Sequence, residues 1–120
     1  MADAAEAHIA RRGFSMFVAI VEAGATPLFV ARYNDAQSGS FEVALAKAQA
    51  AVRFRRPTAA FQDRILRDGR VNLLSMPGLV AVEGGLPILV DEVLVGGIGV
   101  SGGTGEEDGE VAAAALAVIG

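Results

Sequence analysis

The chain has 120 residues, 52% of them hydrophobic, a length that suits one domain with a core of its own. It has no cysteine, which excludes disulfides, thiolate metal sites, cysteine nucleophiles and iron–sulfur clusters. Its single histidine leaves little material for a zinc site. The apolar run over residues 93–100 is too short to span a membrane, and residues 1–12 lack the apolar segment of a secretory signal. We therefore expect one soluble, cytoplasmic domain over residues 1–120, without a membrane partner.

The charge is unevenly distributed along the chain. The net charge is −4, yet seven of the ten basic residues lie between Lys47 and Arg70, and four acidic residues lie between positions 106 and 110. The basic segment suits an anionic ligand such as a carboxylate, or else it is a solvated helix face. A nucleic-acid partner is not expected, because the chain as a whole is acidic and the basic segment holds few aromatic residues.

The first third of the chain predicts a helix followed by a β-hairpin. Ala5 and Ile9 share one face of a helix over residues 3–13, and Gly13 is a typical helix stop. Residues 15–21 and 27–33 are apolar and rich in β-branched residues, as strands are. The turn residues between them predict that the two strands pair as a hairpin.

The rest of the chain predicts three helices and three strands. Phe41, Leu45, Ala48 and Val52 repeat at helical spacing after Ser40, which can cap that helix. The remaining expected elements are a helix over 58–67, strands over 79–82, 86–90 and 93–100, and a helix from Thr104 to near the end of the chain. Five strands in hairpin-linked groups, with helices between the groups, predict an α+β fold with an antiparallel sheet and helices on its faces.

Several short motifs follow one another in a characteristic order. They are Val21-Glu22-Ala23-Gly24, Arg32-Tyr33-Asn34-Asp35, Ala46-Lys47-Ala48, Arg56-Pro57-Thr58, Gly84-Gly85-Leu86-Pro87-Ile88, Val95-Gly96-Gly97-Ile98-Gly99-Val100-Ser101-Gly102 and Glu107-Asp108. In order and spacing they closely resemble the GlcG/HbpS-like family, and the resemblance covers nearly the whole chain.

The resemblance implies a profilin-like fold, with a five-stranded antiparallel sheet between helices, and assembly into dimers or larger rings. Members of this family, which also forms the C-terminal domain of PduO-type proteins, are described as haem-binding, haem-degrading or redox-sensing. Others accompany glycolate or diol utilisation enzymes. The family name alone therefore implies a fold more firmly than a chemistry.

One departure from the family concerns the turn between the last two predicted strands. Family members usually have Asp-Gly there, whereas this chain has Asp91-Glu92. A two-residue type I′ turn places both residues at positive φ, which favours glycine at the second position. We therefore expect either another turn type or a different contact at Glu92.

A GxGxxG string over residues 97–102 is similar to the glycine-rich loop of dinucleotide-binding folds. No second strand follows it to complete that fold, and the acidic residues after it would repel a phosphate. Thr104 and Glu107 instead fit a helix capping box. The glycines are better explained if they let the strand bend, or let a helix, a neighbouring subunit or a flat ligand approach the backbone.

His8 is the one imidazole and the first candidate for an axial ligand of haem iron. The alternative interpretation is a partly exposed surface histidine. Tyr33, Met16 and Met76 are further candidate iron ligands, although packing in the core is the favoured explanation for each of them.

Five other residues are candidates for contacts with a ligand. The resemblance places Arg32, Lys47 and Thr58 at matching positions, and it adds Gly85 and Ser101 from the glycine-rich strands. An arginine suits bidentate recognition of a carboxylate, and a lysine supplies a point charge. The structural alternative for Arg32 and Lys47 is an ion pair with Asp35, Glu42 or Asp108.

Two function hypotheses follow. In the first, the protein binds haem or another tetrapyrrole through His8. In the second, it is a cofactor-independent enzyme, an acid/base isomerase, a tautomerase or a condensing or cyclising catalyst, with Glu83 and Asp108 as its acid and base. An accessory oligomeric protein is a third reading. Under each hypothesis the high apolar content predicts self-association.

Overall fold

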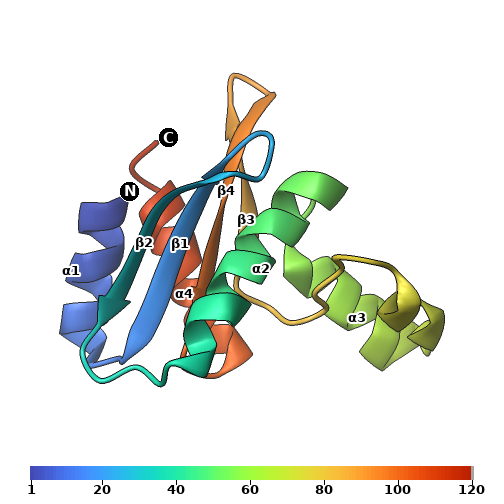
Figure 1. Cartoon of the computed structure of the whole chain (residues 1–120), viewed down its shortest axis with the longest axis horizontal. Helices are drawn as coiled ribbons and strands as arrows, with labels where there is room; N and C mark the ends of the chain where they lie inside the picture. The colour runs from blue at the N-terminus through green and yellow to red at the C-terminus, as the bar shows by residue number, and fades with distance from the viewer. Residues whose placement is uncertain (120) are drawn as a thin grey trace.

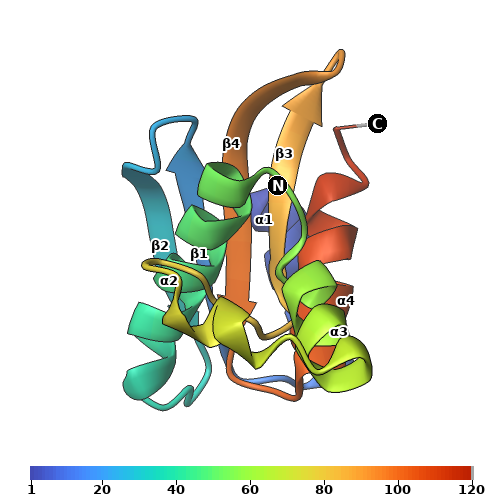
Figure 2. The same ribbon diagram turned by 90° about the vertical axis from the view of Figure 1, so that its right-hand side faces the viewer.

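The computed structural model describes residues 1–119 and contains one four-stranded antiparallel sheet with helices on both faces (Figures 1 and 2). The elements are α1 (Ala2–Arg12), β1 (Met16–Glu22), β2 (Pro27–Tyr33), α2 (Gly39–Phe54), α3 (Thr58–Asp68), the 3-10 helix η1 (Val71–Ser75), β3 (Gly85–Val90), β4 (Val93–Ser101) and α4 (Gly105–Leu116). The strand order is β2-β1-β4-β3, so the two hairpins meet where β1 pairs with β4. Within residues 1–119 no helix is both long and apolar enough to cross a bilayer.

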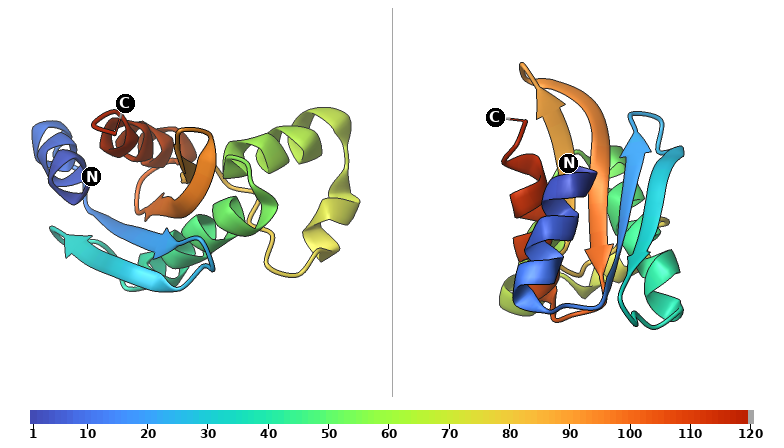
Figure 3. Two further views of the ribbon diagram at one scale, coloured as in Figure 1. Left: turned by 90° about the horizontal axis from the view of Figure 1, so that it is seen from above. Right: turned by 90° about the vertical axis from the view of Figure 1, so that its left-hand side faces the viewer.

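The two faces of the sheet carry different helices (Figure 3). Side chains alternate along β1, so Met16 and Val18 point to the face covered by α1 and α4, and Phe17 and Ala19 point to the face covered by α2. Each face buries its own cluster of apolar side chains, which places the core in two layers. The predicted α+β class and the antiparallel sheet are thus confirmed.

Glycines in β4 let α2 lie directly on the sheet. A Cβ atom at Gly99 would collide with the backbone of Ala44 and Ala48, and one at Gly97 would collide with the backbone of Ala48. The facing positions on α2 are themselves alanines, so two backbones meet with little side chain between them. The close approach of α2 therefore explains Gly97 and Gly99 of the GxGxxG string, and a bound nucleotide is not needed to explain them. The capping box of Thr104 and Glu107 at the start of α4 is also confirmed.

The predicted fifth strand is wrong, because residues 79–82 form an irregular segment between η1 and β3. Just after this segment the backbone N–H of Glu83 donates to the side chain of Gln62 on α3, 2.9 Å away. The chain then turns at Gly84, which has a φ of 132°. The approach to β3 is therefore tied to a helix rather than to a neighbouring strand. Residues 71–75 form a 3-10 helix that the sequence pattern did not indicate.

Two helix ends also differ from the prediction. Helix α2 begins at Gly39, with Ser38 rather than Ser40 at the cap position, and Ser40 is buried. Helix α4 ends at Leu116, short of the expected position. The final residue of that prediction, Gly120, lies outside the described residues.

The β3–β4 turn keeps a tight form although it lacks glycine. Val90 pairs with Val93, so Asp91 and Glu92 alone make the connection, and their φ values are 50° and 66°. Both are positive, as a type I′ turn requires, so the expectation of another turn type is wrong. A non-glycine residue in this region costs about 1–2 kcal/mol, and aspartate tolerates it better than glutamate.

We predict that Glu92→Gly stabilises the protein by about 1 kcal/mol, because it removes backbone strain at the second turn position. The measurement is the urea midpoint of unfolding. Glu92→Ala is the matched control, since it removes the same side chain and leaves the strained φ. An equal gain in both variants would show that the side chain, not the backbone, is responsible.

Candidate functional site

A buried ion pair joins α2 to α4 beside the end of β4. The Lys47 Nζ lies 2.9 Å from the Asp108 Oδ2, and the two side chains are only 1% and 3% exposed. Both groups have further partners. The Lys47 Nζ donates to the Val100 carbonyl at 2.9 Å, and the Asp108 Oδ1 accepts from the Gly103 N–H at 3.0 Å. Among the described residues no buried side-chain nitrogen or oxygen lacks a partner.

Two glycines make room for this pair. A Cβ at Gly84 would lie 2.9 Å from the Lys47 Nζ and from the Asp108 Cβ, so no larger residue fits. The next residue, Gly85, donates its N–H to the Thr58 Oγ1 at 2.9 Å, and Thr58 is fully buried at the start of α3. The structure therefore brings together the predicted residues Lys47, Thr58 and Gly85.

These residues are engaged with one another rather than open to a ligand. Lys47 pairs with Asp108, one of the three acidic partners considered above as its structural alternative. Ser101, at the end of β4, is 7% exposed and lies opposite Phe17 on the neighbouring strand β1. We call Lys47, Thr58, Gly84, Gly85 and Asp108 the central cluster. The contacts within the central cluster hold α2, α3, β3 and α4 together.

Burial raises the pKa of the Asp108 carboxyl, while the Lys47 ammonium beside it opposes that rise. A raised pKa suits an acid–base role, but both carboxylate oxygens already have partners and the side chain is only 3% exposed. Glu83, the other predicted acid or base, is half-buried with its side chain beside Gly109 at the start of α4. No hydrogen bond links Glu83 to Asp108 within residues 1–119, and their joint catalytic role stays a prediction.

His8 lies in a second polar group, at the seam between α1 and α4. Its Nε2 is 2.6 Å from the Glu110 Oε2, and the Arg12 Nε is 2.9 Å from the same oxygen. The Arg11 Nη2 lies 3.4 Å from the His8 Nδ1. The hydrogen bond with His8 lowers the pKa of the Glu110 carboxyl, and the charge of Arg12 lowers it further. Glu110 was missed in the sequence because 102 positions separate it from His8.

Arg32 stands apart from both groups. Its Nε donates to the Ala36 carbonyl at 2.9 Å, and its Nη2 lies 3.7 Å from Asp35, so this ion-pair alternative is present. No hydrogen bond or ion pair joins Arg32 or His8 to Lys47 in the described part of the chain. The six predicted ligand-contacting residues therefore fall into three places: the central cluster with Ser101 near it, the α1–α4 seam, and the end of β2.

The other candidate iron ligands have different surroundings. Met16 is fully buried in the core, whereas Met76 is partly exposed in the loop after η1. Tyr33 lines a cavity of about 500 Å³ between α1 and the end of β2, together with Glu6, Ile9, Ala10, Gly13, Ser15 and Asn34. Burial and the nearby carboxylate of Glu6 raise the pKa of the Tyr33 phenol, which favours the protonated side chain. Within residues 1–119 no three or more histidine, aspartate or glutamate side chains gather in a way that could hold a metal ion.

Comparisons with known proteins identify the family to which this α+β chain belongs. The family model described as "Haem degrading protein HbpS-like" matches residues 1–117. The chain is 31% identical over 119 residues to a 15.0 kDa protein from the dhaT-dhaS intergenic region of Citrobacter freundii, covering 97% of this chain and 84% of that one. It is 32% identical over 91 residues to Protein GlcG of Escherichia coli K12, covering 76% and 67%.

Solved structures agree with the sequence relatives. The crystal structure of a PduOC:heme complex matches with a TM-score of 0.88 and 30% identity, covering 98% of this chain and 88% of that chain. A double-mutant form of Streptomyces reticuli HbpS matches with a TM-score of 0.88 and 32% identity, covering 99% and 81%. The chain belongs to the HbpS-like family.

We predict that Lys47→Met lowers the free energy of unfolding by about 3–5 kcal/mol at pH 7, because it leaves the Asp108 carboxylate buried without a counter-charge. Without Lys47 the folded-state pKa of Asp108 rises further, so its protonated form favours folding at low pH. This contribution is present below the unfolded-state pKa and is lost as the pH rises through the folded-state pKa. The deficit relative to the wild type should therefore shrink between about pH 7 and pH 4.

The control is the double variant Lys47→Met/Asp108→Leu, which removes both charges. Apolar replacement of a whole buried pair is often neutral, so we expect the double variant to regain most of the lost stability at pH 7. Urea unfolding at both pH values measures this. A double variant as unstable as the single one would show that the loss comes from packing rather than from an unpaired charge.

Proposed function

We propose that this protein binds a small ligand and that the ligand is haem or another tetrapyrrole, with His8 as the axial ligand of the iron. The observation that carries the proposal is the contact between His8 and Glu110. A histidine that binds a metal through one ring nitrogen usually donates the other N–H to a carboxylate, which fixes the ring. The His8 Nε2 has such a partner in the Glu110 carboxylate at 2.6 Å.

The second ring nitrogen is the one that an iron would use. The His8 Nδ1 faces Arg11, whose exposed side chain lies 3.4 Å away. An exposed arginine can swing aside at little cost, which would leave a half-buried imidazole already oriented by a carboxylate. The similarity to the haem complex of PduOC supports haem as the ligand. When bound, haem would supply ligand exchange and redox chemistry at its iron.

The other predicted ligand-contacting residues lie away from His8. Arg32 is half-exposed and its pair with the fully exposed Asp35 is long, so its guanidinium can bind an anion, but Arg32 lies beside Phe17 on the α2 face of the sheet rather than on the α1–α4 face. Lys47, Thr58, Gly85 and Ser101 are buried and would reach a ligand only where the seam between α2 and β4 opened. Arg12 adds a cation beside His8.

A haemin titration followed by absorbance tests this proposal. We expect a saturable Soret shift with one haem per chain, and we expect His8→Ala to displace the Soret band and to weaken binding by about tenfold or more, since the iron loses its ligand. Arg11→Ala should keep the band or strengthen binding, because it uncovers the Nδ1.

Glu110→Gln removes the carboxylate that orients His8 but keeps the imidazole. We therefore expect weaker haemin binding, with a Soret band close to that of the wild type. If His8→Ala leaves the Soret band at its wild-type position, ligation by His8 is wrong. If the wild type shows no saturable shift, the haem assignment itself is wrong.

We also propose that the chain self-associates through its β3–β4 hairpin. Leu89 and Val93 are 55% and 60% exposed, and Leu89 borders an apolar cavity of about 300 Å³ that Leu116 and Ile119 also line. Exposed apolar side chains gathered in this way usually mark an interface. A symmetric contact between two copies would bury this patch on both.

Light scattering after size exclusion tests self-association. We expect the wild type to exceed the mass of one 12.3 kDa chain, and we expect Leu89→Lys to shift it towards that mass. Leu66→Lys is the control, because Leu66 is 74% exposed on α3, away from the hairpin. A monomeric wild type at high micromolar concentration would contradict the proposal.

A further inference from the structure

The end of α2, helix α3 and η1 form an arm that stands out from the sheet (Figures 1 and 3). Residues 53–70 of this arm contain six arginines and two aspartates, a local charge of +4. The other 102 residues contain four basic and twelve acidic residues, a charge of −8. Positive charge is therefore concentrated on one projecting part of an acidic protein.

The arginines of the arm have no carboxylate partners among the residues that the structure describes. Within residues 1–119 the ion pairs involve His8, Arg12, Arg32 and Lys47, and none involves an arginine of the arm. The two aspartates on α3 lie on the same helix as two of these arginines, Arg64 and Arg67, and form no ion pair with either of them. Elsewhere in the molecule most basic side chains are paired, so this part of the surface has unused capacity to bind an anion.

Two of these arginines line a cavity of about 140 Å³ between α3 and η1. Its lining consists of Arg56, Ala60, Phe61, Arg64 and Leu73. Guanidinium groups and an aromatic ring thus surround one small space. A water molecule occupies about 30 Å³ in the liquid, so the cavity has room for a group a few times larger.

Arg56 is held in place at the cavity. Its guanidinium carbon lies 5.5 Å from the centroid of the Phe61 ring, and its Nε donates to the Phe54 carbonyl at 3.2 Å. Phe61 is buried and packs edge-on against Phe54, with ring centroids 5.6 Å apart. The terminal nitrogens of Arg56 are left with no partner among the described residues. A guanidinium fixed in this way loses less conformational entropy when it binds a ligand.

We propose that this cavity binds a small oxyanion, the carboxylate or phosphate group of a compact metabolite. The planar fork of Arg56 matches two oxygens of such a group, and Arg64 supplies a second cation. Phe61, Ala60 and Leu73 offer apolar surface for a short carbon chain. The cavity is far too small for a tetrapyrrole, so this site is distinct from the proposed haem site at His8.

The test is a titration of the full-length haem-free protein with sodium phosphate and, separately, sodium succinate. Sodium chloride at equal ionic strength is the reference, and the readout is the NMR signals of the arginine Nε–Hε groups. We expect saturable shifts of Arg56 and Arg64 with at least one of the two anions. Arg64→Gln and Arg56→Gln should each weaken binding about tenfold, because each removes a charged donor from the anion.

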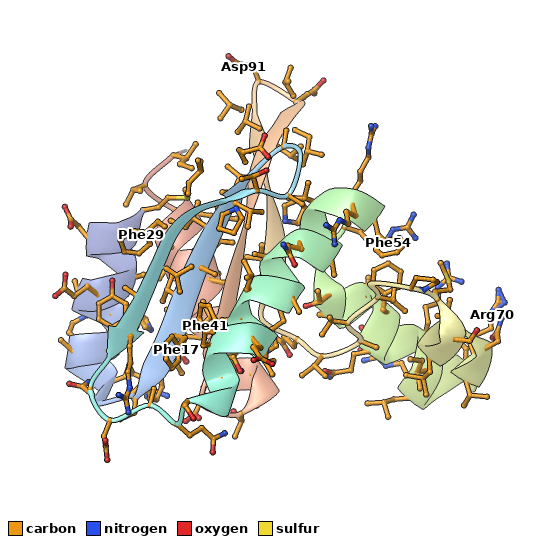
Figure 4. The ribbon with its side chains drawn as sticks, in the orientation of Figure 1. Phe17, Phe29, Phe41, Phe54, Arg70 and Asp91 are labelled. Atoms are coloured by element: carbon orange, nitrogen blue, oxygen red, sulfur yellow. The ribbon has the colours of Figure 1, made fainter. Side chains whose placement is uncertain are left out.

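Arg70→Gln is the matched control. Arg70 carries the same charge at the outer end of the arm, where its side chain points away from α3 (Figure 4). We expect this variant to change the affinity less than about threefold, the effect of net charge alone. Equal weakening by Arg70→Gln and Arg64→Gln would overturn the proposal, since it would show general attraction to the arm. Absence of saturation with both anions would overturn it as well.

The oxyanion site and the haem site can fail independently. Arg64→Gln should leave the haemin titration unchanged, and His8→Ala should leave the phosphate and succinate titrations unchanged. If the protein binds haemin but shows no saturable shift with either anion, the proposed haem binding stands and the oxyanion site is wrong. The opposite result would retain the anion site alone.

Discussion

The buried contact between Lys47 and Asp108 is the interaction on which the rest of this structure depends. It joins α2 on one face of the sheet to α4 on the other, past the end of β4. The Lys47 ammonium also donates a hydrogen bond to the Val100 carbonyl on β4. Two charges removed from water are tolerated only if their polar atoms are satisfied, and here they are. Gly84 must lack a side chain for the pair to form.

This constraint changes how the family motifs are understood. The Gly84-Gly85 pair, Lys47, Thr58 and Asp108 belong to the segments that resemble the family, and the structure shows them engaged with one another. These residues therefore account for a shared fold more directly than for a shared ligand. The groups with capacity for a ligand lie elsewhere, at the α1–α4 seam and on the arginine-rich arm.

Local patterns predicted most of the elements well. Alternating apolar residues and turn signals placed both hairpins, and helical spacing placed the four α-helices within a few residues. The error at residues 79–82 has a physical reason. A short apolar run is compatible with a strand or with an irregular segment, and the choice depends on whether a neighbouring strand or a helix takes its hydrogen bonds. Here the bond after the run goes to Gln62 on α3.

The sequence by itself determined the α+β class, the family, the absence of thiol chemistry and the concentration of arginines after Lys47, because these depend on composition and on spacing along the chain. Only the tertiary structure decided which charges meet. His8 and Glu110, and Lys47 and Asp108, are separated by 102 and 61 positions, and no local preference encodes such pairs. Packing of α1, α2 and α4 on a common sheet brings them together. The same packing closes the central cluster to solvent and leaves the arm exposed.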